Sequence, residues 1–208
     1  FRSEDNYFYN LLTLKYELEI DSNNPDVLFH SVDYFNKEGH LKYNNGFTKK
    51  IFFTGENIDP VSVDTHFSLS FKQNSKQNYR LPLWTQYSNW FEKNDNILNR
   101  DPAFLISKKS LLSSRKKFTS LKPYFCSFIA SKPVGERVNF VPKLNEVKKV
   151  HNLGRLYTNS FMRAPGRGDQ KRKLTFMKPF KFNISFENTN SDGYVTEKIL
   201  HSMYAGSI

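Results

Sequence analysis

Short apolar runs separated by polar turns recur along most of the chain. The runs at residues 27–32, 51–53, 66–71 and 124–131 each predict a strand, and a further strand is expected at 180–188. Apolar runs of this length, bounded by turn residues, are typical of strands buried in a parallel sheet. Because helical segments lie between the strands, the pattern predicts an α/β fold with parallel sheet in both halves of the chain.

Helical spacing of apolar side chains marks the intervening segments. It is present in residues 7–14, after which residues 16–20 alternate as a strand would. Apolar residues also recur every three positions in residues 138–147, which predicts a helix beginning near Gly135. Pro142 weakens that helix, because an interior proline removes a backbone hydrogen bond and clashes with the preceding turn.

The distribution of these elements predicts two domains. We expect an N-terminal α/β domain at 1–105, a polar, basic linker at 106–123 and a second α/β domain at 124–208. The linker is expected to be partly helical around residues 110–118. The glycine-rich, basic stretch at 152–173 favours either a mobile surface loop or a positively charged rim near an anionic ligand.

Composition limits the class of protein. Hydrophobic residues make up 38% of the 208 residues and aromatic residues 16%, which predicts a globular chain. Cys126 is the single cysteine, so no intrachain disulfide can form, and no Cys/His spacing of a zinc site is present. The sequence has no apolar run long enough for a transmembrane helix and no signal-peptide core at its start, although an upstream anchor is compatible with it.

Positive charge is concentrated in the second half of the chain. The net charge is +11, and residues 108–208 hold 20 Lys and Arg against 6 Asp and Glu, whereas residues 1–60 hold 6 against 10. Such asymmetry is compatible with an anionic partner, which would be nucleic acid, anionic lipid or a nucleotide diphosphate. A solvated basic face is the simpler alternative.

The segment at 182–204 carries the strongest chemical signal. We expect a strand ending at Glu187 and Asn188, a polar turn, and a helix opening near Tyr194, with Val195, Ile199 and Met203 on one face. The free N–H groups at a helix start and the helix dipole favour a phosphate. Lys198 would add a full positive charge there. The alternative is an ordinary helix with a charged first turn.

The sequence FENTNSDGYVTEKI at 186–199 resembles the signature of the α1,3/4-fucosyltransferases, glycosyltransferase family 10. KKIFFTGENIDP at 49–60 and YRLPLW at 79–84 are similar to segments of the family's N-terminal domain, above all in bacterial members. FCSFIASKPVGERVNFVPKLNEVKKV at 125–150 looks like the opening of its donor domain. The resemblance spans residues 8–208 and is weakest at 92–123 and 152–178.

This resemblance implies a fold and an activity. The fold would be GT-B-like, with two Rossmann-like domains facing across a cleft and the second domain incomplete in this chain. The activity would be inverting transfer of fucose from GDP-fucose to a hydroxyl of an acceptor glycan, with O3 of GlcNAc in α1,3 linkage as the expected acceptor. Linkage and acceptor stay open at this point, and this 208-residue piece alone is not necessarily active.

The resemblance also implies roles for individual residues. Glu56 would be the catalytic base that removes the proton of the acceptor hydroxyl, with Asp59 as the reserve candidate. GDP-fucose would be bound by a group of residues in the second half: Arg137, Asn188, Tyr194, Glu197 and Lys198. Glu197 would meet ribose or fucose hydroxyls, and Arg137 and Lys198 would stabilise the charge that develops on the leaving phosphate.

No cofactor is expected, because Arg137 and Lys198 would stabilise the leaving phosphate in place of a metal ion and the sequence has no Asp-x-Asp motif. Stimulation of the activity by a divalent metal without a dedicated site is compatible with this. The expected partners are GDP-fucose and an acceptor oligosaccharide or glycoconjugate, and a peripheral membrane contact is compatible with the basic surface. A bacterial or viral protein would be cytoplasmic or membrane-peripheral, and a eukaryotic one would be anchored in the Golgi membrane and face the lumen.

Two other functions stay open on the sequence alone. The first is a polyanion or nucleic-acid binder that uses the basic second half. The sequence contains no nucleic-acid-binding motif, and nucleic acid is not expected as a partner. The second is a transferase for a different nucleotide sugar.

Overall fold

The computed structural model describes residues 6–32, 39–90, 105–112, 122–160, 162–165 and 169–208. These residues form two compact units. The N-terminal unit contains the described residues up to Gln86 together with the segment Ser191–Thr196. The C-terminal unit contains the described residues from Tyr87 to Asn190 together with Glu197–Ile208.

The N-terminal unit is built on a four-stranded parallel sheet in the order β1-β2-β3-β4. Sequential parallel neighbours of this kind agree with the strands predicted from the apolar runs. Its elements are α1 (Tyr7–Leu12), β1 (Val27–His30), η1 (Gly39–Tyr43), β2 (Lys49–Phe53), η2 (Pro60–Ser62), β3 (Phe67–Ser70), β4 (Asn78–Arg80) and the 3-10 turn η3 (Leu83–Tyr87), whose last residue is the first of the C-terminal unit.

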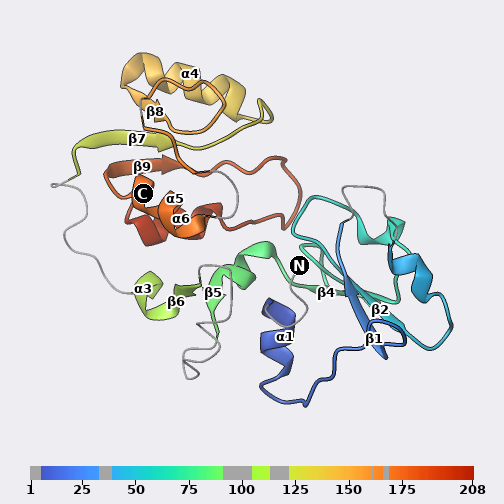
Figure 1. Ribbon diagram of the computed structural model, residues 1–208. Helices are drawn as coiled ribbons and strands as arrows, with labels where there is room; N and C mark the ends of the chain where they lie inside the picture. The colour runs from blue at the N-terminus through green and yellow to red at the C-terminus, as the bar shows by residue number, and fades with distance from the viewer. Residues whose placement is uncertain (1–5, 33–38, 91–104, 113–121, 161, 166–168) are drawn as a thin grey trace. The chain divides into compact units, whose positions relative to one another are not determined.

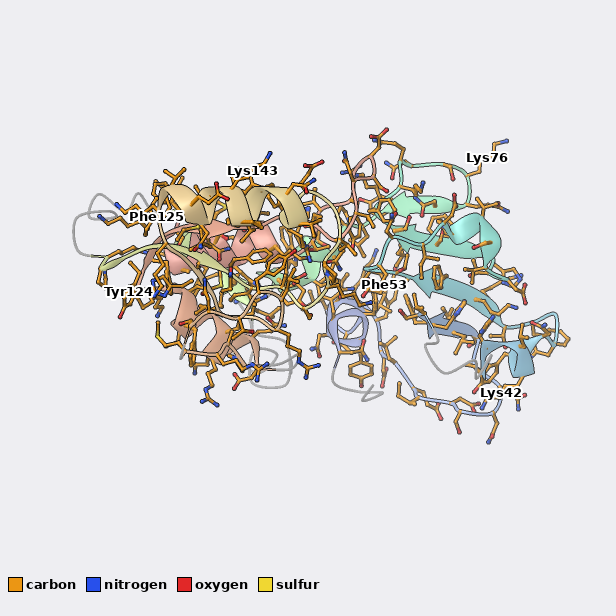
Figure 2. All side chains as sticks on the ribbon, turned by 90° about the horizontal axis from the view of Figure 1, so that it is seen from above. Lys42, Phe53, Lys76, Tyr124, Phe125 and Lys143 are labelled. Carbon is orange, nitrogen blue, oxygen red and sulfur yellow. The ribbon has the colours of Figure 1, made fainter. Side chains whose placement is uncertain are left out.

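Aromatic packing attaches α1 to this sheet. The Phe8 ring stacks on Phe29 of β1 at a centroid distance of 5.0 Å and meets Phe53 of β2 edge-on at 5.2 Å. Figure 2 shows Phe53 beside this helix. Asn6 begins the helix, because its side chain accepts hydrogen bonds from the backbone N–H groups of Phe8 and Tyr9.

The strand predicted at residues 16–20 is wrong. These residues are in irregular structure, and Tyr16 and Ile20 are 53% and 47% exposed. An alternating pattern makes a strand only where a neighbouring strand accepts its hydrogen bonds and a core covers its apolar face. Among the residues that the structure describes, this segment has neither.

The C-terminal unit contains a three-stranded parallel sheet in the order β8-β7-β9, with β7 in the centre. A second, two-stranded sheet pairs β5 with β6. The elements are β5 (Ser88–Asn89), β6 (Ile106–Ser107), α3 (Lys108–Leu112), β7 (Tyr124–Phe128), α4 (Arg137–Val147), β8 (Val150–Asn152), α5 (Gln170–Met177), β9 (Phe180–Ile184) and α6 (Lys198–Ala205).

Helices cover the three-stranded sheet, with α4 on one side and α5 and α6 on the other (Figure 1). One core cluster joins Cys126 and Phe128 of β7 to Val141 of α4 and Val150 of β8. A second cluster joins Leu174 and Met177 of α5 to Ala205 of α6. This layered α/β arrangement confirms the predicted fold class in each half.

The helix predicted near Gly135 is confirmed as α4, with Pro142 inside it. The helix tolerates the proline because Pro142 is exposed, as is the following Lys143, which points away from the unit in Figure 2. Steric conflict with the preceding turn is therefore kept on the solvent side.

Several boundaries differ from the predicted ones. β9 ends at Ile184, before the predicted end at Glu187 and Asn188. Residues 106–112, predicted to belong to a linker, form β6 and α3, and the rest of the predicted helix at 110–118 lies outside the described residues from 113 onward. Within the described parts of the chain, no helix has the length and apolar character needed to cross a membrane.

Candidate functional site

Arg137 ties the loop that follows β9 to the start of α4. Its side chain is 3% exposed. Nη2 donates to the backbone carbonyls of Phe186 at 2.8 Å and Glu187 at 2.9 Å, and to Asn188 Oδ1 at 3.2 Å. The predicted pair Arg137 and Asn188 is therefore brought together. Burial lowers the pKa of Arg137, and the nearby Glu187 carboxylate opposes that shift.

The guanidinium keeps further donors. Nη1 reaches only the Lys132 carbonyl, at 3.4 Å, and the buried Nε–H has no hydrogen-bond partner among the described residues. An unpaired buried donor is costly unless something accepts from it. Arg137 thus shapes the loop and retains hydrogen-bonding capacity next to it.

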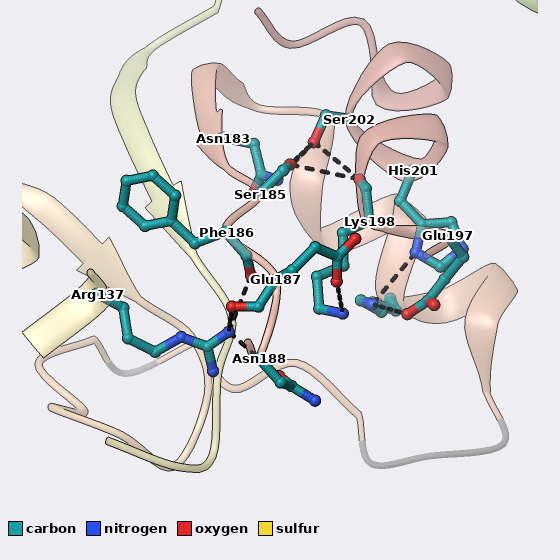
Figure 3. Close-up of polar contacts among 11 residues, drawn as sticks. Arg137, Asn183, Ser185, Phe186, Glu187, Asn188, Glu197, Lys198, His201 and Ser202 are labelled. Carbon is teal, nitrogen blue, oxygen red and sulfur yellow. Dashed lines mark hydrogen bonds and ion pairs between the residues drawn. The ribbon is translucent and has the colours of Figure 1, made fainter. Parts of the chain in front are cut away.

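Glu187 connects Arg137 to Lys198. The Glu187 backbone carbonyl accepts from Arg137, and its carboxylate accepts from Lys198 Nζ at 2.7 Å. Both side chains of this ion pair are about one fifth exposed, at 22% for Lys198 and 19% for Glu187. Two predicted cationic residues therefore meet at a glutamate that the sequence analysis assigned only to the end of a strand (Figure 3).

A second charged group lies on α5 and α6. Lys173 Nζ is 4.0 Å from the Glu197 carboxylate and 3.2 Å from Nδ1 of His201. The side chains of Lys173 and Glu197 are 19% and 15% exposed, and His201 is fully buried. Burial lowers the pKa of Lys173, with the Glu197 carboxylate acting against it.

The tautomer of His201 follows from its partner. An ammonium group has donors and no acceptor, so Nδ1 must accept from Lys173 and the ring proton must be on Nε2. Burial, together with the charges of Lys173 and Lys198, lowers the pKa of His201 to about 3, so the ring is neutral. Tyr87 packs edge-on against the ring at 5.5 Å, and burial raises the pKa of Tyr87 to about 12.

A hydroxyl and amide network joins α6 to the sheet below it. Asn183 Nδ2 donates to Ser202 Oγ at 2.6 Å and to Ser185 Oγ at 3.0 Å, and the two serine hydroxyls lie 2.6 Å apart. Ser127 of β7 donates to Asn183 Oδ1 at 2.9 Å. This network fixes the position of the first turns of α6 relative to β9.

The start of α6 differs from prediction, and its apolar spacing does not mark its buried side. The helix begins at Lys198, four residues after Tyr194. Val195, Ile199 and Met203, predicted to lie on one face, are 37%, 51% and 44% exposed. The buried residues of this helix are Leu200, His201, Ser202 and Ala205. Ser202, in the polar network, and His201, which contacts Lys173, face inward and so determine the orientation of α6. Apolar spacing alone did not reveal this orientation.

Tyr194 belongs to the N-terminal unit rather than to the group around Lys198. It is 7% exposed, and its ring packs edge-on against Phe71 at 5.2 Å. Gly193 precedes it at φ 79°, and its carbonyl accepts from Arg80 Nη2 at 3.4 Å. Asn57 donates to Ser191 Oγ at 2.9 Å. The segment Ser191–Thr196 is therefore held at the carboxyl ends of β2, β3 and β4.

Glu56 lies in the loop directly after β2. A short turn fixes it, because the Glu56 N–H donates to Thr54 Oγ1 at 3.0 Å and the Thr54 hydroxyl is 3.2 Å from the Glu56 carbonyl. Gly55 packs so closely on Leu83 that a Cβ there would lie 2.7 Å from Cδ1. Within the described residues, the Glu56 carboxylate has no hydrogen bond or ion pair. Carboxyl ends of parallel strands are where such folds bind ligands.

Asp59, the reserve candidate, has a structural task. Its carboxylate accepts from the Val61 N–H at 3.1 Å and so begins η2. It also lies 3.9 Å from Lys72. Glu56 is therefore the freer carboxylate of the two.

The C-terminal group can bind an anion beside a hydroxyl-rich moiety. Arg137, Lys173 and Lys198 supply three positive charges against the carboxylates of Glu187 and Glu197, and Lys198 is the first residue of a helix whose N–H groups point outward at that end. An excess of positive charge with two carboxylate acceptors suits a phosphorylated sugar or nucleotide.

Sequence reasoning missed Glu187, Lys173, His201 and Tyr87. For Lys173, a signal was present but not used: Asp169 caps α5 by accepting from the Arg172 N–H at 2.9 Å, and Leu174 and Met177 follow at helical spacing. The basic and glycine-rich residues around Lys173 favoured a loop, so this short helix was not predicted.

Family models of fucosyltransferases match both halves of the chain. The model of the alpha-(1,3)-fucosyltransferase FucT N-terminal domain matches residues 1–87, and that of the glycosyltransferase family 10 (fucosyltransferase) C-terminal region matches residues 115–208. Alpha-(1,3)-fucosyltransferase FucT of Helicobacter pylori is 26% identical over 230 residues, which cover 99% of this chain and 46% of that protein. A putative fucosyltransferase-like protein of Arabidopsis thaliana is 50% identical over 36 residues, 17% of this chain and 7% of that protein.

Solved structures share the fold. An α1,3-fucosyltransferase crystal structure with GDP superposes with a TM-score of 0.67 at 23% identity, and another without a named ligand with 0.71 at 22%; each covers 99% of this chain and 62% of that one. A third, with GDP-fucose, gives 0.60 at 20% identity, covering 93% of this chain and 70% of that one. The chain thus spans just under half the length of the Helicobacter relative and about three fifths of the first two structures.

Proposed function

The chain belongs to glycosyltransferase family 10, the fucosyltransferases of GT-B fold, and from this premise we propose that it transfers fucose from GDP-fucose to a hydroxyl of an acceptor glycan. The transfer inverts the anomeric centre, and O3 of a GlcNAc residue is the acceptor atom. The C-terminal unit binds the donor nucleotide sugar, and the N-terminal unit supplies the base.

One observation carries the donor assignment. Arg137 and Lys198, from two different helices, converge on the single residue Glu187, and Lys198 is the first residue of α6. A diphosphate at this helix start would compete with the Glu187 carboxylate for Lys198 and would accept from the donors that Arg137 retains. Charge on the leaving phosphate grows in the transition state, so these cations lower the barrier most at that point. They supply this stabilisation without a metal ion.

Glu197 and Asn188 serve the hydroxyl groups of the donor. A carboxylate accepts two strong hydrogen bonds from a vicinal diol such as ribose. Asn188 is held by Arg137, which keeps its amide at the same loop. Tyr194, buried against Phe71, would act from the segment that packs on the N-terminal unit.

Glu56 acts as the general base in this proposal. Its carboxylate takes the proton of the acceptor hydroxyl while that oxygen bonds to the anomeric carbon of fucose, and the bond from that carbon to the β-phosphate oxygen breaks, releasing GDP. The Thr54–Glu56 turn fixes the backbone from which the carboxylate projects, and the carboxylate has no competing partner in the described residues.

Donor binding is tested by calorimetry with GDP-fucose, GDP-mannose and UDP-galactose in moderate salt. We expect preference for GDP-fucose and at least about tenfold weaker binding for Lys198→Ala, since charge-assisted hydrogen bonds contribute roughly 1.5–3 kcal/mol each. Lys143→Ala, on the exposed face of α4, is the matched control. Equal, salt-sensitive binding of every nucleotide would instead indicate a polyanion binder.

The base is tested by turnover. Glu56→Gln should abolish transfer while GDP-fucose affinity stays within about twofold, because the amide keeps the shape but cannot take a proton. Asp59→Asn is the control and should retain turnover. Loss of donor affinity in Glu56→Gln, or loss of turnover in Asp59→Asn alone, would contradict the assignment.

A further inference from the structure

The carboxylate of Glu197 has a counter-ion that its own helix does not provide. It makes no capping hydrogen bond to α6, and its neighbour Lys198 is paired with Glu187 at 2.7 Å. Lys173, from α5, is the cation that faces Glu197. The two adjacent charges of α6 are thus paired separately, one with α5 and one with the loop after β9 (Figure 3).

Lys173 is itself held in place. Its ammonium group donates to Nδ1 of the fully buried His201, whose ring is braced edge-on by Tyr87. His201 follows Glu197 by one helical turn, and the backbone N–H of His201 donates to the backbone carbonyl of Glu197 at 2.9 Å. A lysine side chain loses much rotational freedom when one end is fixed, so this arrangement restricts where the Nζ can lie.

Removing Lys173 would leave Glu197 as a carboxylate with 15% exposure and no cation at its side among the described residues. Such a carboxylate turns toward water, because burial penalises an uncompensated charge. It would then direct fewer acceptor lone pairs at a diol.

We propose that Lys173 is a positioning residue for donor binding: it keeps the Glu197 carboxylate directed at the ribose hydroxyls of the guanosine nucleotide, and His201 keeps Lys173 in place. This inference rests on the proposed function and deepens it. It adds α5, outside the sequence motif, to the machinery that recognises the ribose.

The test compares the affinities of the chain for GDP and for 2′-deoxy-GDP by calorimetry. The unaltered chain should bind GDP about tenfold more tightly, since one hydrogen bond to a charged acceptor is lost with the 2′-hydroxyl. Lys173→Met and Glu197→Gln should both weaken GDP binding about tenfold while changing 2′-deoxy-GDP binding less than about twofold. Lys173→Arg, which retains the charge, should restore most of the preference.

Lys171→Met, an exposed lysine of the same helix, is the matched control and should keep the full preference. Should Lys173→Met not fold, as judged by circular dichroism, the pair His201→Leu and His201→Asn replaces it. Leucine removes the acceptor for Lys173 and should reduce the preference, whereas asparagine offers an amide oxygen and should retain it.

The outcomes separate the inference from the function on which it rests. Equal weakening of GDP and 2′-deoxy-GDP by Lys173→Met would overturn the positioning role and leave GDP binding standing. Equal affinity of the unaltered chain for the two nucleotides would also overturn it, because Glu197 would then not contact the 2′-hydroxyl. No binding of GDP by the unaltered chain would remove the proposed function and the inference together.

Discussion

Acid should destabilise the C-terminal unit through His201. The ring is fully buried and neutral, with its pKa lowered to about 3, whereas an unfolded histidine has a pKa near 6.5. Between these two values the unfolded chain binds a proton that the folded chain does not. The stabilising contribution is therefore complete only well above pH 6.5 and is lost progressively as pH falls toward 3.

The expected magnitude follows from the two pKa values. Each pH unit well inside this window changes the free energy of unfolding by about 1.4 kcal/mol. The unfolded histidine is half protonated at pH 6.5, so the loss between pH 6.5 and pH 4.5 amounts to about 2 kcal/mol. Because Nδ1 accepts from Lys173 and the site is closed to solvent, no relief by hydration is expected in the folded state.

The measurement compares the unaltered chain with His201→Asn, whose amide oxygen can still accept from Lys173 but does not titrate. Urea unfolding is followed at pH 7.5, 6.5, 5.5 and 4.5 by pulse-labelling hydrogen exchange, evaluated on peptides from α5 and α6. All other titratable groups are the same in both proteins, so the difference between their pH slopes isolates His201. Slopes that agree within about 0.5 kcal/mol over this range would refute a buried, neutral His201.

Two further predictions concern stability. Lys122→Met should lower the free energy of unfolding of the C-terminal unit by about 2 kcal/mol, because Nζ donates to the carbonyls of Phe180 and Ala205 at 2.9 Å each and so joins β9 to the end of α6; an unchanged urea midpoint would contradict this. Gly193→Ala should cost about 2 kcal/mol, because φ is 79° and the added Cβ would lie 2.4 Å from Arg80 Nη1. Its effect should appear as faster hydrogen exchange in Ser191–Thr196, and exchange equal to that of the unaltered chain would show that the segment adapts without strain.

The sequence by itself determined the fold class and the residues that carry the family's motifs. Compact apolar runs such as 51–53 and 124–128 became central strands of parallel sheets, since only a strand covered on both faces needs such a run. The sequence motifs predicted that Arg137 and Lys198 belong to one domain, and in the structure both contact Glu187. Local spacing sufficed here because strand type and helix starts depend on near neighbours in the chain.

Tertiary structure alone decided which charges meet and which faces are buried. Lys173 and Glu197 are 24 residues apart on different helices, and no periodicity within either segment shows that they face each other. The apolar spacing of Ile199 and Met203 did not reveal that they are exposed, because polar partners on β9 and α5 turn Ser202 and His201 inward. Hydrogen bonds and ion pairs are short-ranged and specific, so their partners are fixed only when the strands and helices have been packed together.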